Sequence, residues 1–262
     1  MAKQPIKITV ATVTYNASDN IAKTITSVEQ QDYAAVEHII IDGNSTDDTL
    51  EQIHHYMERN SVAEIKHEIN CLSEPDNGIY DAMNKALMMA TGRYIVFLNA
   101  GDTLHSEHTL SDIAAKAEKY STHPAVIYGD TDVVDSEGRF LRHRRLEPPE
   151  KLTWRDFRYG MLVCHQAFYA RTDIAHNIPY NMKYRFSADY DWTIRVMQEA
   201  ERRGIELCNS NEILADFLQG GTTAKNHRRS LFERLRIMGR HFGWTTAIAE
   251  HFWFVVRAVI RK

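Results

Sequence analysis

The sequence predicts one α/β domain over residues 1–224, with a mostly parallel central sheet flanked by helices, followed by a basic amphipathic helical tail over residues 225–262. Apolar, strand-like runs alternate with segments of helical periodicity, which is typical of βαβ units. A length of 262 residues suits one large domain with an appendage, and 44% hydrophobic and 25% charged residues are ordinary for a globular protein. The chain has no low-complexity linker, so we expect its two halves to be lobes of one domain.

The first half of the chain alternates strand and helix. In order, we expect a strand at 6–14, a helix with Ile21, Ile25 and Val28 inward, a strand at 36–41, a helix with Leu50, Ile53 and Met57 inward, a strand at 62–72, a helix at 79–90 and a strand at 94–98. The second half is less regular. There we expect a helix at 107–120, a strand at 125–134 that enters a hairpin turn at 135–138, a strand at 165–170 and a helix at 189–203.

Charge is distributed unevenly along the chain. Residues 225–262 hold nine Lys/Arg and two Glu, a net charge of +7, so the first 224 residues carry −11 of the total of −4. An acidic body is unsuited to nucleic-acid binding, whereas a basic, aromatic tail suits an anionic membrane surface. The three cysteines form no CxxC pair and the N-terminus shows no signal-peptide pattern, so we expect a reducing, cytoplasmic location.

Phosphate-binding glycine loops are missing from the expected positions. The segment after the first strand has neither G-x-G-x-x-G nor a P-loop, so a divalent cation is the expected way to hold phosphates. Asp42, Asp76 and Asp102 each follow an expected strand, at the edge where α/β sheets bind ligands. Each aspartate alone could equally be a turn or helix-cap residue, but their joint placement favours a binding site.

These segments together resemble a known family. The ordered set consists of TVTYNAS, IIIDGNSTDDT, EPDNGIYDAMNKAL, FLNAGD and FSADYDW, spread over roughly residues 6–200. It is similar to the inverting glycosyltransferases of family 2, which have the GT-A fold. The resemblance implies transfer of a hexosyl or N-acetylhexosaminyl group from a nucleotide-diphosphate sugar, with the uridine diphosphate sugars as the commonest donors of the family.

The resemblance also assigns the donor side of the site. The segment matching Thr14, Tyr15 and Asn16 lines the nucleotide pocket, the aspartate matching Asp42 reads the base, and the Asp76 segment closes over the pocket. The D-x-D motif, which binds Mg²⁺ or Mn²⁺ in the family, appears here as Asn99-Ala100-Gly101-Asp102. Because the first acid is Asn and the third position is Gly, we expect Asp102 to be the metal ligand and Asn99 to assist with its carbonyl oxygen.

The acceptor side is assigned in the same way. The family's catalytic base matches Asp189, with Asp191 as the alternative two residues later, and Ala188 stands where the family often has Glu. An N-cap role is the structural alternative for these aspartates. His165 and Gln166 match the acceptor-side segment, although a histidine there could be a hydrogen-bonded structural residue.

The expected function is assembly of a cell-surface polysaccharide or glycolipid, with a glycan or lipid-linked glycan as acceptor. A nucleotidyltransferase is less consistent with the sequence, because the glycine-rich first loop of that class is missing. A binding module without activity is the other alternative, supported only by Asn99 and Ala188.

The tail has an apolar helical face and a basic approach to it. The apolar face comprises Trp244, Ile248, Phe252, Val255, Val256 and Val259, opposite Glu250, Arg257 and Arg261; the basic residues before it are Lys225, Arg228, Arg229, Arg234, Arg236 and Arg240. The apolar run is shorter than the roughly 18 residues that span a bilayer. We expect a helix lying on the inner face of the plasma membrane, or alternatively a helix packed on the domain or on a second subunit.

Overall fold

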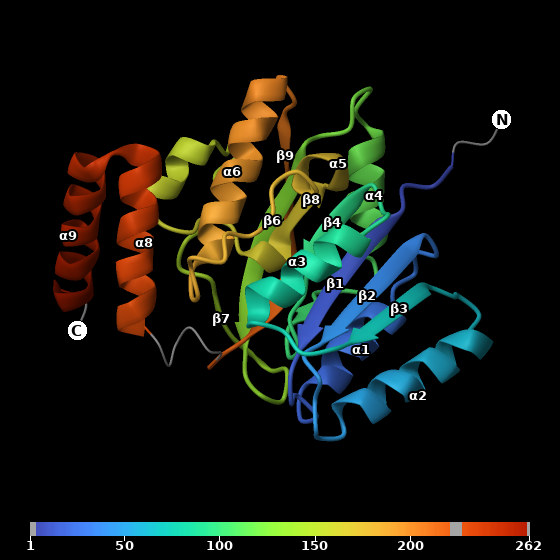
Figure 1. Ribbon diagram of the computed structural model, residues 1–262. Helices are drawn as coiled ribbons and strands as arrows, with labels where there is room; N and C mark the ends of the chain where they lie inside the picture. The colour runs from blue at the N-terminus through green and yellow to red at the C-terminus, as the bar shows by residue number, and fades with distance from the viewer. Residues whose placement is uncertain (1–3, 221–226, 261–262) are drawn as a thin grey trace.

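The computed structural model describes residues 4–220 and 227–260 and has one mixed sheet at its centre (Figure 1). The strand order is β3-β2-β1-β4-β8-β6-β9-β5, with β7 paired to β6. The strands are β1 (Ile8–Thr14), β2 (Val36–Asp42), β3 (Glu68–Ser73), β4 (Tyr94–Phe97), β5 (Thr103–Leu104), β6 (Val126–Val134), β7 (Phe140–His143), β8 (Phe168–Arg171) and β9 (Leu207–Leu218). The predicted α/β class is confirmed.

Helices flank this sheet, and in Figure 1 α3 and α6 lie in front of it. The helices are α1 (Ile21–Glu29), α2 (Thr49–Val62), α3 (Ile79–Met89), α4 (Thr109–Glu118), α5 (Thr172–Ala175), α6 (Ala188–Arg203), α8 (His227–Phe242) and α9 (Trp244–Ile260), with short 3₁₀ helices η1 (Trp154–Tyr159) and η2 (His165–Ala167). The strands β1, β2 and β4 are buried along their whole length, which is typical of parallel strands covered on both faces.

The parallel character of the sheet is limited to two regions. β3, β2, β1 and β4 run parallel, and so do β6 and β9, but β8 is antiparallel to both β4 and β6. The carboxyl ends of β1, β2 and β4 therefore meet at one edge, where their following loops lie together. The hairpin predicted after β6 is present as the antiparallel pair β6–β7.

Three segments differ from the expected elements. The helix α2 continues to Val62, so the third strand occupies only Glu68–Ser73. Residues 165–167 form the 3₁₀ helix η2, and the strand starts at Phe168. The strand β9 was not predicted, because Asn209, Asn211 and Glu212 interrupt its apolar pattern. This segment is a strand because it pairs with β6 and β5, which are distant in the sequence.

The C-terminal segment is a helical hairpin that packs beside α6, at the left of Figure 1. Ile237 and Met238 of α8 and Ala247 of α9 are buried in the main core. A Cβ on Gly239 would lie 2.9 Å from the indole ring of Trp244, so the glycine lets α9 close against α8. Among residues 4–220 and 227–260, no helix combines the length and the apolar character needed to cross a bilayer.

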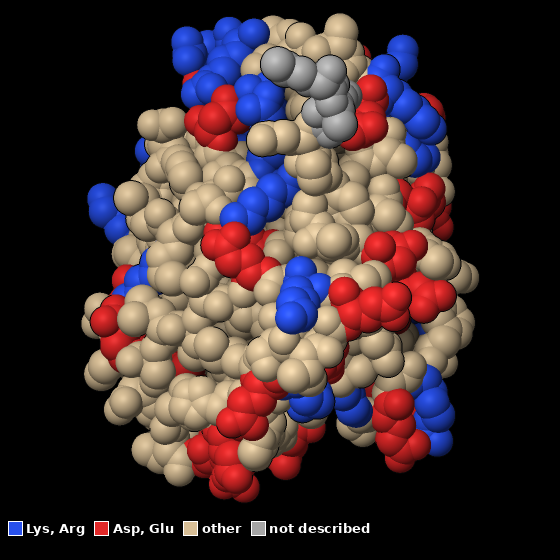
Figure 2. Space-filling view, turned by 90° about the vertical axis from the view of Figure 1, so that its right-hand side faces the viewer, with Lys and Arg blue, Asp and Glu red and all other residues tan. Residues whose placement is uncertain are grey.

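Charges of both signs are interspersed on the face of the molecule seen in Figure 2. Lysine and arginine side chains alternate there with aspartate and glutamate, separated by uncharged residues. Such a mixture is not the continuous basic field by which proteins attract nucleic acid. This face therefore agrees with the expectation from the sequence that the acidic body of the chain is unsuited to nucleic-acid binding.

Candidate active site

The loops after β1, β2 and β3 form a cradle around one glycine. A Cβ on Gly43 would lie 2.7 Å from Oδ2 of Asp76 and 3.2 Å from Cδ2 of Tyr15, so a larger residue would have to displace these side chains. Tyr15 is 64% exposed, and Asp76 is fixed by the Gly78 N–H, which donates to its Oδ1 at 2.8 Å. An exposed ring and a carboxylate thus converge over a bare backbone, an arrangement suited to a flat, polar ligand.

Asp42 and Asn16 fix the walls of this cradle. Asp42 is fully buried at the end of β2, and its carboxylate accepts hydrogen bonds from the Ser45 N–H at 2.9 Å and the Ser73 hydroxyl at 2.7 Å. Asn16 has a left-handed backbone (φ 46°), and its Oδ1 accepts from the Thr46 N–H at 2.8 Å. The structure therefore brings the predicted residues Thr14 to Asn16, Asp42 and Asp76 together at one rim.

The loop after β4 carries Asn99 and Asp102 in different environments. Asp102 is 4% exposed, and its two carboxylate oxygens accept from Gln166 Nε2 at 2.7 Å and from the Leu218 N–H at 3.0 Å. Burial raises the pKa of Asp102 to about 6, although these hydrogen bonds and the nearby His165 oppose the shift. Asp102 is thus integrated into the floor of the site, and Asn99 faces His165, with its Nδ2 3.1 Å from Nε2 of the ring.

The backbone angle and the packing of position 101 explain why this loop has a glycine there. Gly101 adopts φ 104°, and a Cβ there would lie 2.7 Å from Cδ2 of Leu218. An aspartate, which the D-x-D pattern has at this position, would be strained and would collide with β9. The departure from the motif therefore follows from the packing of Leu218, which the sequence pattern did not identify as a site residue.

Asp189 lies in the same site, at the first turn of α6. Its Oδ2 is 3.5 Å from Nδ1 of His165, and its Oδ1 accepts a hydrogen bond from the Tyr80 hydroxyl at 3.0 Å. Burial favours the neutral acid, but the hydrogen bond and charge of His165 and the charge of Arg234 outweigh it, so the pKa of Asp189 lies below its usual range. The side chain is a carboxylate at neutral pH. His165 thus lies between Asn99 and Asp189.

Asp191 points away from this site. It is fully buried, and its carboxylate binds Arg195 Nε at 2.7 Å and His241 Nε2 at 2.8 Å. His241 belongs to α8, so the contact ties the C-terminal hairpin to α6. Ala188 is also fully buried, which leaves no space for the glutamate that the family often has there.

Three predicted site residues carry buried polar atoms that pair with nothing in the described part of the chain. These atoms are Thr14 Oγ1, Asn99 Oδ1 and Gln166 Oε1. Buried polar groups are nearly always hydrogen-bonded, so unpaired ones call for a bound water, ion or ligand. At the candidate site these three atoms are available to a polar ligand or to water; other buried polar atoms without a partner among the described residues lie elsewhere in the protein.

Some residues at the site carry little signal in the sequence. Tyr80 was expected only as part of a core helix, yet its hydroxyl holds Asp189. Thr24 joins α1 to the Asn99 loop: its Oγ1 donates to the Asp102 carbonyl at 2.7 Å and accepts from the Gly101 N–H at 2.8 Å. The only sequence signal for Tyr80 was its place in the motif EPDNGIYDAM. Nothing in the sequence singles out Thr24.

The fold and this rim of acidic and amide side chains are those of a glycosyltransferase with the GT-A fold. The family model described as glycosyl transferase family 2 matches residues 9–192, most of the chain. The chain belongs to this family.

Curated relatives agree with this assignment. A PGL/p-HBAD biosynthesis glycosyltransferase of Mycobacterium tuberculosis (strain ATCC 25177 / H37Ra) is 31% identical over 183 residues, which cover 70% of this chain and 66% of the relative. The matched region thus spans slightly less than two thirds of that protein. The amylovoran biosynthesis glycosyltransferase AmsB of Erwinia amylovora is 26% identical over 218 residues, which cover 81% of this chain and 69% of AmsB.

Solved structures show the same fold. The crystal structure of S. aureus TarS 1–349 in complex with UDP-GlcNAc aligns with a TM-score of 0.67 at 18% identity, covering 95% of this chain and 71% of TarS. The mannosyltransferase PcManGT from Pyrobaculum calidifontis, in complex with GDP-Man and Mn²⁺, aligns with a TM-score of 0.58 at 17% identity, covering 95% of this chain and 74% of that protein. At this identity the likeness concerns the fold.

Proposed function

We propose that this chain is an inverting glycosyltransferase that moves a sugar from a nucleotide diphosphate, in the first instance a uridine diphosphate, to a hydroxyl of a glycan or lipid-linked glycan. The process proposed is assembly of a cell-surface polysaccharide or glycolipid. The relatives named for PGL/p-HBAD and amylovoran biosynthesis support the process, and neighbours solved with UDP-GlcNAc and GDP-Man support the donor class.

One arrangement supports the proposed reaction type: the Asp189 carboxylate lies 3.5 Å from His165, whose ring lies 3.1 Å from Asn99, so the proposed base and the donor-side loop flank one histidine. An inverting transfer needs a base beside the attacking hydroxyl, across the anomeric carbon from the leaving diphosphate. We assign Asp189 as that base, His165 and Gln166 to the acceptor side, and Thr14, Tyr15, Asn16, Asp42, Asp76 and Asn99 to the donor side. Asp191 is left with a structural role.

A divalent cation fits the donor side through Asn99 and Asp102. Mg²⁺ and Mn²⁺ prefer oxygen ligands, and Asn99 Oδ1 is a buried oxygen that is unpaired within the described residues. Asp102 adds a carboxylate from the same loop, but its oxygens already accept two hydrogen bonds. A cation held there would stabilise the negative charge that grows on the leaving diphosphate.

Mn²⁺ should therefore tighten donor binding, and this effect should depend on Asn99 and Asp102. In calorimetric titrations of uridine diphosphate sugars, we expect Mn²⁺ to raise affinity and chelator to abolish the gain. Asn99→Ala should reduce the gain, and Asp102→Ala should eliminate it together with transfer activity. Ser136→Ala, in the β6–β7 turn, is the control variant: it is prepared and measured in the same way and should behave like the wild type. Equal activity with and without chelator would refute the metal assignment.

The exposed face of α9 suggests how the enzyme reaches a lipid-linked acceptor. Ile248 and Phe252, one turn apart, are 58% and 69% exposed, and Trp253 beside them is 52% exposed. Arg229, Arg236 and Arg240 are exposed on α8. We propose that this hairpin rests on the anionic, cytoplasmic face of the membrane, with α9 inserted in the interface. The side chains of Val255, Val256 and Val259 and the residue Lys225, all part of the sequence hypothesis, lie outside the described parts of the chain.

Replacing Ile248 and Phe252 together by serine should prevent flotation with anionic liposomes at low salt. Because both side chains are exposed, the fold and the transfer to a soluble acceptor should be preserved, which deletion of α9 would not guarantee. Val62→Ser, at a residue 83% exposed on α2, is the matched control and should still float. A wild-type protein that never floats would refute membrane attachment.

A further inference from the structure

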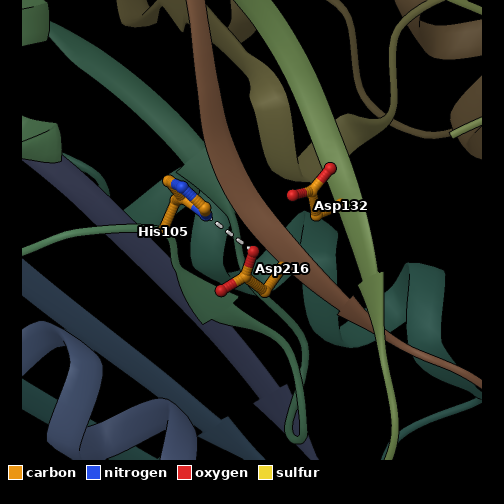
Figure 3. Close-up of side chains that lie close together, drawn as sticks. All are labelled: His105, Asp132 and Asp216. Atoms are coloured by element: carbon orange, nitrogen blue, oxygen red, sulfur yellow. Dashed lines mark hydrogen bonds and ion pairs between the residues drawn. The ribbon is translucent and has the colours of Figure 1, made fainter. Parts of the chain in front are cut away.

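Two histidines and two aspartates converge across four strands beyond the donor site. Asp132 on β6 and Asp216 on β9 are register partners, and β7 brings His143 opposite Asp132. His105 follows β5, whose Thr103 pairs with Asp216. Figure 3 shows the His105 ring directed at Asp216, with the Asp132 carboxylate on the neighbouring strand. The four side chains therefore occupy one row across the sheet.

The distances within this row are those of a nearly formed metal site. His105 Nδ1 lies 2.8 Å from Asp216 Oδ1, and His143 Nδ1 lies 2.8 Å from Asp132 Oδ1. One ligand atom from each of His105, Asp132 and Asp216 lies within 4.8 Å of the others. Ligand atoms around a tetrahedral zinc ion are about 3.4 Å apart, given metal–ligand bonds of about 2.0–2.2 Å, so small side-chain rotations would close this set of three. His143 is joined to the set through Asp132.

The charges of this row call for a cation. Asp132 and Asp216 oppose each other on adjacent strands, a placement that is unfavourable for like charges. The Asp132 side chain is only 8% exposed, which makes its charge more costly. Each carboxylate is paired with an imidazole, and no lysine or arginine of the described ranges forms an ion pair with either. A divalent ion bound between the strands would offset the two negative charges.

We propose that His105, Asp132, Asp216 and His143 bind one zinc ion. Two imidazole nitrogens and two carboxylate oxygens are ligands that zinc accepts, and four protein ligands are typical of a structural site. The set contains no residue of the donor site. The zinc ion would fasten the two-residue strand β5 and the exposed strand β7 to the long pair β6–β9.

This position connects the ion to the active site through the backbone. Asp216 lies two residues before Leu218, whose N–H donates to Asp102, and β5 begins directly after Asp102. The ion would hold both segments that fix Asp102. Its loss should therefore loosen the floor of the donor site without removing any donor ligand.

Zinc binding can be measured on the full-length protein without nucleotide, first as purified and then after its metal has been stripped with chelator. We expect about one equivalent of zinc by elemental analysis, and a visible Co²⁺ spectrum of tetrahedral type after substitution. Asp216→Asn and His105→Ala should weaken Co²⁺ binding by about tenfold or more. His143→Ala removes a ligand that is 68% exposed, so this variant should fold even if the others do not, and it too should lose the spectrum.

Two controls test whether the bound Co²⁺ belongs to this row. Asp32→Asn breaks an exposed His–Asp pair of the same kind, His108 Nδ1 to Asp32 Oδ2 at 2.6 Å, and should leave Co²⁺ binding unchanged. Asn99→Ala affects the proposed donor-site cation and should also retain the spectrum. A wild-type protein that takes up no Co²⁺ would show that the row consists of hydrogen-bonded His–Asp pairs only. A spectrum unaltered in His105→Ala, Asp216→Asn and His143→Ala would place the bound ion elsewhere and overturn the proposal.

Discussion

Asp189→Asn should lower kcat by about 10²-fold or more, the usual cost of losing general-base assistance. The substitution keeps the shape of the side chain and an oxygen for the Tyr80 hydroxyl, but removes the group that would accept the proton of the attacking hydroxyl. Donor affinity should change little, because the nucleotide residues lie on other loops. Steady-state transfer kinetics and donor titration calorimetry would measure the two effects separately.

The matched control for this variant is Asp191→Asn, two residues further along the same helix. Because Asp191 binds Arg195 and His241 away from the site, this variant should retain most of its kcat under conditions where it is folded. The product of the wild-type enzyme should have inverted anomeric configuration by NMR. If Asp191→Asn lost kcat and Asp189→Asn did not, the assignment of the base would be shifted by two residues.

The parallel half of the fold was predictable because its signals are local. Strands β1, β2 and β4 are buried along their whole length and rich in β-branched and aromatic residues, and the helices between them show one apolar face. The strand β9 carried no such signal. It contains polar residues inside the sheet, including Asp216, and its place beside β6 and β5 is fixed by pairing between distant segments.

The positions of the candidate site residues were predictable to a similar extent. Asp42, Asp76, Asn99 and Asp189 could be proposed because each follows a strand or begins a helix in a recognisable pattern. Which of their atoms are free for a ligand was not predictable, since it depends on contacts with residues far along the chain. Leu218 illustrates this: its N–H occupies a carboxylate oxygen of Asp102, and its side chain excludes an acid at position 101.

Asp191→Ala should destabilise the protein by about 3–5 kcal/mol, the range for removing one member of a buried ion pair. The carboxylate is fully buried, and its loss would leave Arg195 and the nearly buried His241 without their partner. Urea unfolding followed by circular dichroism at pH 7 would measure the change. Hydrogen exchange should show the earliest loss of protection in α8 and α9, because His241 connects the hairpin to α6.

The pH dependence distinguishes loss of this ion pair from creation of a simple cavity. Burial opposes ionisation of Asp191, but His241 and Arg195 outweigh it and lower its pKa. Its contribution is therefore complete above the unfolded-state pKa of about 4 and is lost as pH falls through the lower folded-state pKa. The difference in free energy of unfolding between wild type and Asp191→Ala should shrink in acid, whereas a cavity would cost the same at every pH.

Glu199→Ala, which breaks ion pairs near the C-terminal end of α6, is the control. It should lower the free energy of unfolding much less at pH 7, since surface ion pairs contribute little. An equal loss in both variants would mean that Asp191 does not anchor the hairpin.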